Sequence, residues 1–85
     1  MIFKNPKELD SNFDKYVSDC RLRIGENIRK VREKKGYNQE QLAEIMQVSR
    51  STISKIENGK FNCSLDYISK FSWFLEFDLL ISIRD

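Results

Sequence analysis

The ionisable side chains of this chain are distributed unevenly, and their distribution indicates what chemistry they can perform. Residues 21–60 carry ten Lys and Arg against five Asp and Glu, whereas residues 1–20 and 61–85 have net charges of −1 and −2. A basic segment between mildly acidic ends is typical of a chain in which one face contacts phosphates. A solvated helix surface would have the same charge, so charge alone does not separate the two interpretations.

The chain lacks the side chains on which most catalytic and metal sites depend. It contains no histidine, and its two cysteines, Cys20 and Cys63, lie far apart. Imidazole-dependent catalytic triads and zinc sites are therefore excluded. Its three glycines are too widely spaced for a phosphate-binding loop. We expect no enzymatic activity, no metal and no cofactor. We interpret both cysteines as buried small apolar residues rather than as a disulfide or a redox switch.

Length and hydropathy predict a single small domain with no membrane segment. The chain has 85 residues, a size at which a hydrophobic core is only just sufficient and a second subunit often adds burial. Its longest uncharged stretches are far shorter than the roughly 20 apolar residues of a membrane helix. The polar residues that begin at Lys4 leave no hydrophobic region for a signal peptide. We expect a cytoplasmic protein.

The elements that would position the basic segment are helices, and the first helical segment is long. Asn5 and Pro6 form a start signal, as N-cap and first helical residue, with Glu8 completing a capping box. An apolar stripe at helical spacing follows. It consists of Leu9, Phe13, Tyr16, Val17, Cys20, Ile24, Ile28 and Val31. The pattern predicts helix from Pro6 toward Gly36 and leaves open whether it is one helix or two with a break over residues 21–25.

Three short helices and one strand are predicted after Gly36. Asn38, Ser49 and Ser64 are N-cap residues for helices that run to about Met46, Asn58 and Leu75. The inward face of the last helix is predicted to consist of Leu65, Ile68, Phe71, Ser72 and Leu75. The final residues then alternate with period 2 and predict a strand whose apolar face is Phe77, Leu79, Ile81 and Ile83.

The predicted strand has no partner in its own subunit, because no other segment has a period of 2. We therefore expect it to pair antiparallel with a second copy, with Trp73 and Phe74 as its neighbours. The predicted fold class is mainly α. It has four or five helices, with a helical extension over residues 1–21, a core over 22–75 and a dimerisation strand over 76–85.

Residues 24–75 resemble the phage repressor and Cro type (XRE-like) of helix-turn-helix domain. The resemblance is strongest over Tyr37-Asn38-Gln39-Glu40-Gln41-Leu42-Ala43 and over Val48-Ser49-Arg50-Ser51-Thr52-Ile53-Ser54-Lys55-Ile56-Glu57-Asn58-Gly59. Ala43 is small enough for two helices to approach closely, and an apolar plug is expected from Leu42, Val48, Ile53 and Ile56. Gln47 replaces the family's usual turn glycine. It must take a positive φ at a cost of roughly 1 kcal/mol, or the turn must change shape.

The resemblance implies that the helix beginning at Arg50 enters the major groove of double-stranded DNA. Its base-reading residues would be Arg50, Ser51, Ser54 and Lys55, with Arg50 paired to guanine O6 and N7. The implied phosphate-binding residues are Gln39, Ser49, Thr52, Asn58, Lys60 and Asn62. Arg32 and Glu57 match a structural salt bridge of the family. We therefore expect a sequence-specific transcriptional regulator, acting as a dimeric repressor on an inverted repeat.

The two ends of the chain leave other regulatory roles open. The C-terminal strand resembles that of HipB-type antitoxins, which implies an alternative role: neutralising a protein toxin and repressing the operon. A controller of a restriction-modification system is a further alternative, although such proteins resemble all-helical dimers and the strand argues against it. The N-terminal helix is expected to cover the core, extend the dimer or bind a partner.

Overall fold

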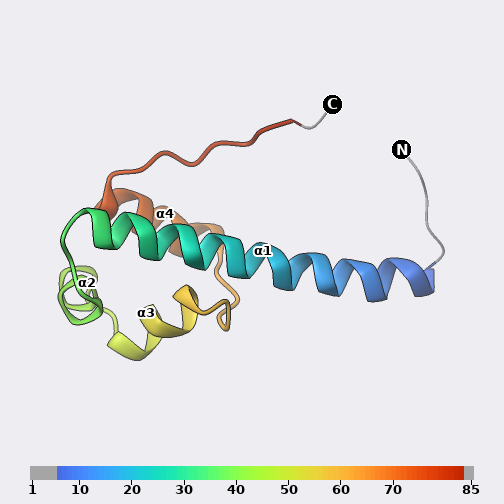
Figure 1. Cartoon of the computed structure of the whole chain (residues 1–85), viewed down its shortest axis with the longest axis horizontal. Helices are drawn as coiled ribbons and strands as arrows, with labels where there is room; N and C mark the ends of the chain where they lie inside the picture. The colour runs from blue at the N-terminus through green and yellow to red at the C-terminus, as the bar shows by residue number, and fades with distance from the viewer. Residues whose placement is uncertain (1–5, 84–85) are drawn as a thin grey trace.

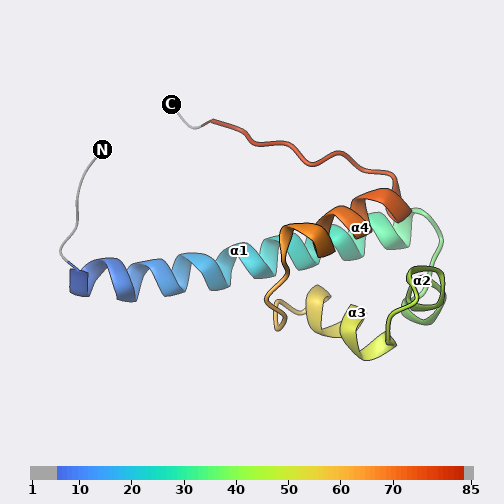
Figure 2. The ribbon, with the colours of Figure 1, turned by 180° about the vertical axis from the view of Figure 1, so that it is seen from behind.

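The long first helix is the axis on which the rest of this computed structural model is arranged. The structure describes the backbone of residues 6–83 and the side chains of residues 12–83. Its elements are α1 (Pro6–Lys34), α2 (Gln39–Met46), α3 (Arg50–Glu57) and α4 (Leu65–Leu75). The three shorter helices gather around the C-terminal half of α1, and its N-terminal half projects beyond them (Figures 1 and 2).

The alternative between one helix and two is decided in favour of one, because α1 continues without a break through residues 21–25. Gly36, beyond its C-terminus, has φ +85, as its place after the last helical residues predicts. The proposed start signal at Asn5 lies outside the described residues.

The predicted caps of the short helices are present. The Asn38 side chain accepts from the Gln41 N–H, and the Gln41 side chain accepts from the Asn38 N–H, each at 2.8 Å. Ser49 and Ser64 accept from the third residue of their own helices in the same way. Gln47 takes φ 57, so of the two alternatives the first is found. The turn keeps its shape, and a residue other than glycine adopts the left-handed conformation. These local interactions explain why the helices begin and end where sequence patterns place them.

The core lies where the C-terminal half of α1 meets α2, α3 and α4. Its buried apolar residues are Ile28, Leu42, Ala43, Met46, Ile53, Ile56, Phe71 and Leu75. The predicted plug is thus confirmed for Leu42, Ile53 and Ile56, while Val48 is half-buried at its edge. The prediction was wrong for Leu65, which is 72% exposed because the first turn of α4 lies beside an open hollow. Cys20 and Cys63 are free and half-buried rather than buried.

Gly25 allows α1 and α3 to approach closely. A Cβ at this position would lie 2.3 Å from the Ile56 carbonyl oxygen and 2.7 Å from that of Glu57. Both atoms belong to the backbone at the end of α3, which cannot rotate away as a side chain would. A glycine inside a helix therefore has a packing reason here.

The C-terminal strand predicted over residues 76–85 is not present in the described part of the single chain, which ends at residue 83. Residues 77–83 are extended but form no strand, because a strand requires backbone hydrogen bonds to a neighbour and no other segment within residues 6–83 supplies them. Glu76, with φ 59, ends α4, and the segment turns back along α1 (Figures 1 and 2). Arg84 and Asp85 lie outside the described residues.

Of the predicted strand face, only Phe77 packs against the core. Its N–H donates to the Ser72 carbonyl at 3.2 Å, and the Ser72 hydroxyl donates to the Phe77 carbonyl. Leu79, Ile81 and Ile83 are exposed. Trp73 is 78% exposed and Phe74 half-buried, so only Phe74 contributes to the core. Within the described part of the chain, no helix is both long and apolar enough to cross a bilayer.

The Gly25→Ala variant tests the close approach of α1 and α3. In an isolated helix alanine is favoured over glycine by about 1 kcal/mol, but overpacking typically costs about 1–3 kcal/mol. Because the clash here is with backbone carbonyls, we expect an overpacking cost near the top of that range and a net loss of about 2 kcal/mol in the free energy of unfolding by urea. Glu26→Ala, at an exposed neighbouring position, should change it by less than about 0.5 kcal/mol. A more stable Gly25→Ala protein would contradict the packing described.

Candidate nucleic-acid interface

The turn between α2 and α3 holds the two helices in a defined relation. Gln47 is left-handed, and its N–H donates back to the end of α2. The N–H of Val48 then donates to the Ala43 carbonyl at 3.0 Å. Ala43 and Ile53 are buried, so neither helix can move without disturbing the core.

The four residues expected to read bases lie together on the outer face of α3. Arg50, Ser51, Ser54 and Lys55 line one open hollow, with only Ser54 half-buried. Ile53 and Ile56, on the opposite face, are buried. α3 therefore presents a continuous polar surface to solvent, on the side of the molecule away from the C-terminal segment (Figure 1). One face of α3 is therefore exposed while its opposite face is fixed in the core.

Arg50 also lines a second hollow, at the start of α2. The other residues that line this hollow include Asn38, Gln39 and Glu40. The first backbone N–H groups of a helix have no partner within the helix, and the helix dipole favours an anion there. An anion in this hollow would therefore meet the amide of Gln39 and the guanidinium of Arg50 together, while the carboxylate of Glu40 opposes it.

Three of the expected phosphate-binding residues hold the ends of α3. The Ser49 hydroxyl lies 2.8 Å from the Thr52 hydroxyl and accepts from the Thr52 N–H at 3.1 Å. At the other end, the Asn58 amide donates to the Ser54 carbonyl at 2.9 Å. These side chains are thus positioned by local bonds before any ligand arrives.

The last two expected phosphate-binding residues follow α3 and lie in different surroundings. The Lys60 N–H donates to the Lys55 carbonyl at 2.7 Å, which keeps Lys60 close to the end of α3 with its side chain exposed. Asn62 instead lines a hollow beside the N-terminal half of α1. The structure does not bring Asn62 to the hollow that Arg50 lines.

The Arg32–Glu57 ion pair is present and buried. Arg32 Nε lies 2.6 Å from Glu57 Oε2, Nη2 lies 3.0 Å from Oε1, and the side chains are 9% and 2% exposed. Arg32 Nη1 also donates to the Tyr37 carbonyl at 2.8 Å. The hydrogen bonds with Glu57 raise the pKa of Arg32 above its ordinary value. The pair connects α1 to the end of α3, as the resemblance implies.

One contact at this site is absent from the sequence predictions. Gln39 Nε2 donates to Glu57 Oε1 at 3.1 Å, so the buried pair also holds the first residue of α2. The side chain expected to bind phosphate therefore has one donor engaged within the protein. No local pattern reveals this contact, because the two residues are 18 positions apart.

The chain is similar to one family of known proteins and to several individual relatives. Residues 28–79 match a family described as helix-turn-helix. The chain is 39% identical over 57 residues to the control protein C.MunI of Mycoplasma sp, covering 66% of this chain and 77% of that protein. It is 40% identical over 50 residues to the competence pilus inhibition repressor of Acinetobacter baylyi, covering 55% of this chain and 46% of that protein. A relative from Pyrococcus furiosus is 43% identical over 42 residues, which are 49% of this chain and 13% of that protein.

Removing one partner of the buried pair should be far more damaging than removing one partner of an exposed pair. Glu57→Ala leaves the Arg32 charge buried without compensation, so we expect a loss of about 3–5 kcal/mol in the free energy of unfolding. Glu33→Ala removes the partner of Arg29 in an exposed pair of 3.7 Å and should cost less than about 1 kcal/mol. Urea unfolding measures both, and equal losses would contradict a structural role for the buried pair.

Proposed function

The chain belongs to the helix-turn-helix family, and we propose that it is a sequence-specific regulator of transcription that binds double-stranded DNA as a dimeric repressor. The observation that carries the proposal is the exposed face of α3, where four polar side chains line one hollow above a buried apolar face. The names of two relatives, a repressor and a control protein, support a regulatory role. The chain spans less than half the length of that repressor.

In this proposal α3 reads bases in the major groove. An α-helix with its side chains is about 10–12 Å across, so α3 fits the major groove, which is about 12 Å wide. Arg50 donates both arms of its guanidinium to guanine O6 and N7, and Lys55 donates to a guanine or to a phosphate. Ser51 and Ser54 offer hydroxyls that donate or accept as the base requires.

Phosphate contacts on either side of α3 would set its depth and orientation. At the start of α2, the backbone amide of Gln39 and its remaining side-chain N–H point to one strand of DNA. Ser49 and Thr52, and Asn58 and Lys60 at the other end of α3, would bind backbone phosphates on both sides of the groove. Asn62 has the weakest support in this role because it lies beside α1.

A single eight-residue helix contacts few base pairs, so we propose that two copies bind an inverted repeat. Residues 77–83 of the two copies would pair antiparallel and satisfy backbone groups that the single chain leaves exposed. Four exposed apolar side chains support this pairing: Leu79, Leu80, Ile81 and Ile83. Two recognition helices related by the same axis read half-sites about 10 bp apart, or a multiple of that.

A second regulatory role is favoured by one of the comparisons. Similarity to the control protein C.MunI supports a controller of a restriction-modification system. The argument against it is the C-terminal strand, which residues 77–83 form only in the proposed pairing of two copies and not in the described part of the single chain. The antitoxin alternative depended on that same strand and stays a prediction. Neighbouring genes discriminate: a restriction enzyme and methyltransferase favour the controller, and a toxin-like gene favours the antitoxin.

Arg50→Ala tests base reading on the best duplex that the wild-type chain selects from a random pool. Because a bidentate guanine contact is lost, we expect affinity to fall by about 1–3 kcal/mol and preference to relax at one base pair in each half-site. Affinity for random duplex should fall much less. Fluorescence anisotropy at fixed salt measures both, and equal losses on both duplexes would reduce Arg50 to a phosphate contact.

Two other cations serve as controls for this experiment. Lys60→Ala should weaken all duplexes alike and lower the slope of log affinity against log salt by about one unit, because one phosphate contact is lost. Lys30→Ala removes the same charge from the exposed face of α1 and should leave the slope unchanged.

Ile81→Pro tests the pairing of the C-terminal segments without disturbing the single chain. Ile81 is 97% exposed, so its replacement removes no core contact, whereas in a paired strand proline removes a ladder donor. We expect the dissociation constant of the dimer, measured by sedimentation equilibrium, to rise about tenfold or more. Operator affinity should fall steeply with it, because two linked half-sites bind far more tightly than one. Ile81→Val is the matched control, and an unchanged dimer in Ile81→Pro would contradict the pairing.

A further inference from the structure

The N-terminal part of α1, residues 6–24, is here named the arm, and it lies outside the segment that matches the family. Gly25, at its root, is buried, but none of residues 12–24 is. Nineteen helical residues span about 28 Å, and both views show the arm projecting beyond α3 and α4 (Figures 1 and 2). Only the base of the arm packs closely on the body, since a Cβ at Gly59, after α3, would lie 3.0 Å from Leu22 Cδ2.

The arm carries an apolar face that is partly open to solvent. Phe13 is 56% exposed and Tyr16 49%, and the half-buried Val17 and Cys20 continue the same face toward the root. There the face borders a hollow of about 220 Å³ that Phe61 also lines. A helix in a protein derives most of its stability from packing of its apolar face against other groups, so we expect a further surface to cover this face.

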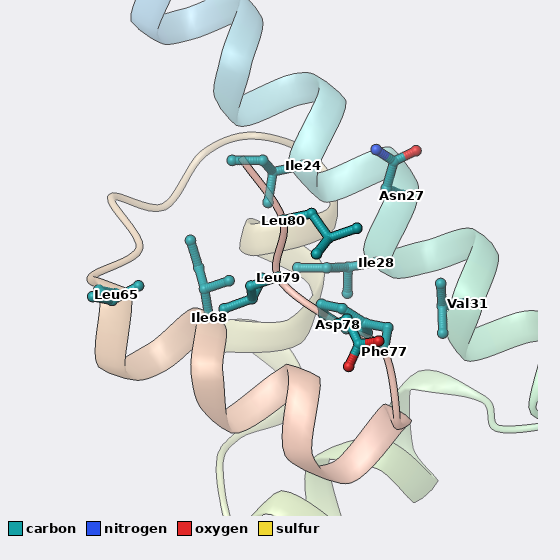
Figure 3. Close-up of a pocket in the computed structure, with 10 residues that line it drawn as sticks. All are labelled: Ile24, Asn27, Ile28, Val31, Leu65, Ile68, Phe77, Asp78, Leu79 and Leu80. Atoms are coloured by element: carbon teal, nitrogen blue, oxygen red, sulfur yellow. The ribbon is translucent and has the colours of Figure 1, made fainter. Parts of the chain in front are cut away.

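The apolar face of the arm is continuous with the surface beneath the C-terminal segment. Ile24 and Ile68 line the hollow beside the arm and also a larger one of about 480 Å³. Leu79 and Leu80 close the larger hollow from the other side (Figure 3). One apolar surface therefore extends from Phe13 to the segment already proposed to pair across the dimer.

The charge of the arm favours a second copy of the chain over nucleic acid. The arm carries four cations, Lys7, Lys15, Arg21 and Arg23, and four anions, Glu8, Asp10, Asp14 and Asp19, so its net charge is zero. A neutral helix has no general attraction for phosphates. Its two arginines are near the root and three of its acids are toward the N-terminus, so two antiparallel arms place opposite charges side by side.

The accessible area of the chain is also large enough for a second copy to cover part of it. The accessible surface is 7071 Å², against about 5,300 Å² for a compact monomer of 10.1 kDa. The difference exceeds the roughly 800 Å² that each partner buries in a standard interface. The radius of gyration, 15.0 Å against about 12 Å for a compact domain of this length, shows the same elongation.

We propose that the arms of two copies pack antiparallel across the two-fold axis of the dimer, near Tyr16. The part of the apolar face from Phe13 to Cys20 is centred there, so Phe13 of each copy would lie against Cys20 of the other. The arms and the C-terminal segments then form a single dimer interface, because their apolar surfaces are continuous. This inference rests on the proposed homodimer and not on the proposed base contacts.

Sedimentation equilibrium of the full chain without DNA tests the arm interface. Because interface aromatics carry much of the binding energy, Phe13→Glu/Tyr16→Glu should raise the dissociation constant of the dimer about tenfold or more. Asn12→Glu/Ser18→Glu adds the same charge at exposed positions off the apolar face and should change the constant less than about twofold. Thermal melting should show an intact core in both variants, because none of the four residues is buried.

Chemical cross-linking supplies an independent readout if a glutamate variant unfolds. In a background of Cys20→Ser and Cys63→Ser, Tyr16→Cys should be joined to its own copy by a short bismaleimide, because Tyr16 is nearest the axis. Ser18→Cys, on the opposite side of the arm, should not. Cross-linking of Ser18→Cys but not of Tyr16→Cys would overturn the proposed geometry.

The outcomes separate this inference from the proposed function. An unchanged dimer in Phe13→Glu/Tyr16→Glu, with Ile81→Pro dissociated, would overturn the arm interface and leave the homodimer in place. A wild-type chain that stays monomeric without DNA at concentrations on the order of 100 μM would overturn both, since its dimer would then be weaker than typical specific association. The arm would in that case fit a different protein, and the base contacts of α3 would be unaffected.

Discussion

The buried Arg32–Glu57 ion pair is the interaction on which the presentation of α3 depends. It joins the last turn of α1 to the last residue of α3, and Gln39 adds the start of α2 through the same carboxylate. Burying two charges is favourable only when their hydrogen bonds are complete. That condition is met, since no buried side-chain nitrogen or oxygen among the described residues lacks a partner. The pair therefore fixes the geometry between the helix proposed to read bases and the helix start proposed to bind phosphate.

Close packing of the helices against one another also holds α3 in place. The absence of a side chain at Gly25 lets α1 lie against the carbonyl groups that end α3, and the buried Ala43 keeps α2 close to the core. Gln47 accepts a left-handed conformation so that the connection stays short. Each of these positions restrains α3 without using any residue of its outer face, which leaves that face available for the proposed contacts with DNA.

Local sequence patterns predicted most of this architecture because caps, glycines and apolar spacing act within a few residues. The capping box at Asn38 and the apolar residues Leu42 and Ile53 are where those patterns place them. Contacts between distant residues were less accessible: the Gln39–Glu57 bond and the position of Asn62 beside α1 depend on tertiary packing. The period-2 pattern of residues 77–83 was interpreted as a strand, but a strand needs a neighbour that a single chain does not supply.

In the proposed complex, two copies of α3 read the bases of an inverted repeat. Selection of duplexes from a random pool by the wild-type chain, followed by sequencing, tests this readout most directly. We expect enrichment of a two-fold symmetric site, with a guanine at a fixed position in each half and half-site centres about 10 bp apart or a multiple of that. Enrichment of no sequence above the starting pool, at a salt concentration where the chain binds DNA, would contradict it.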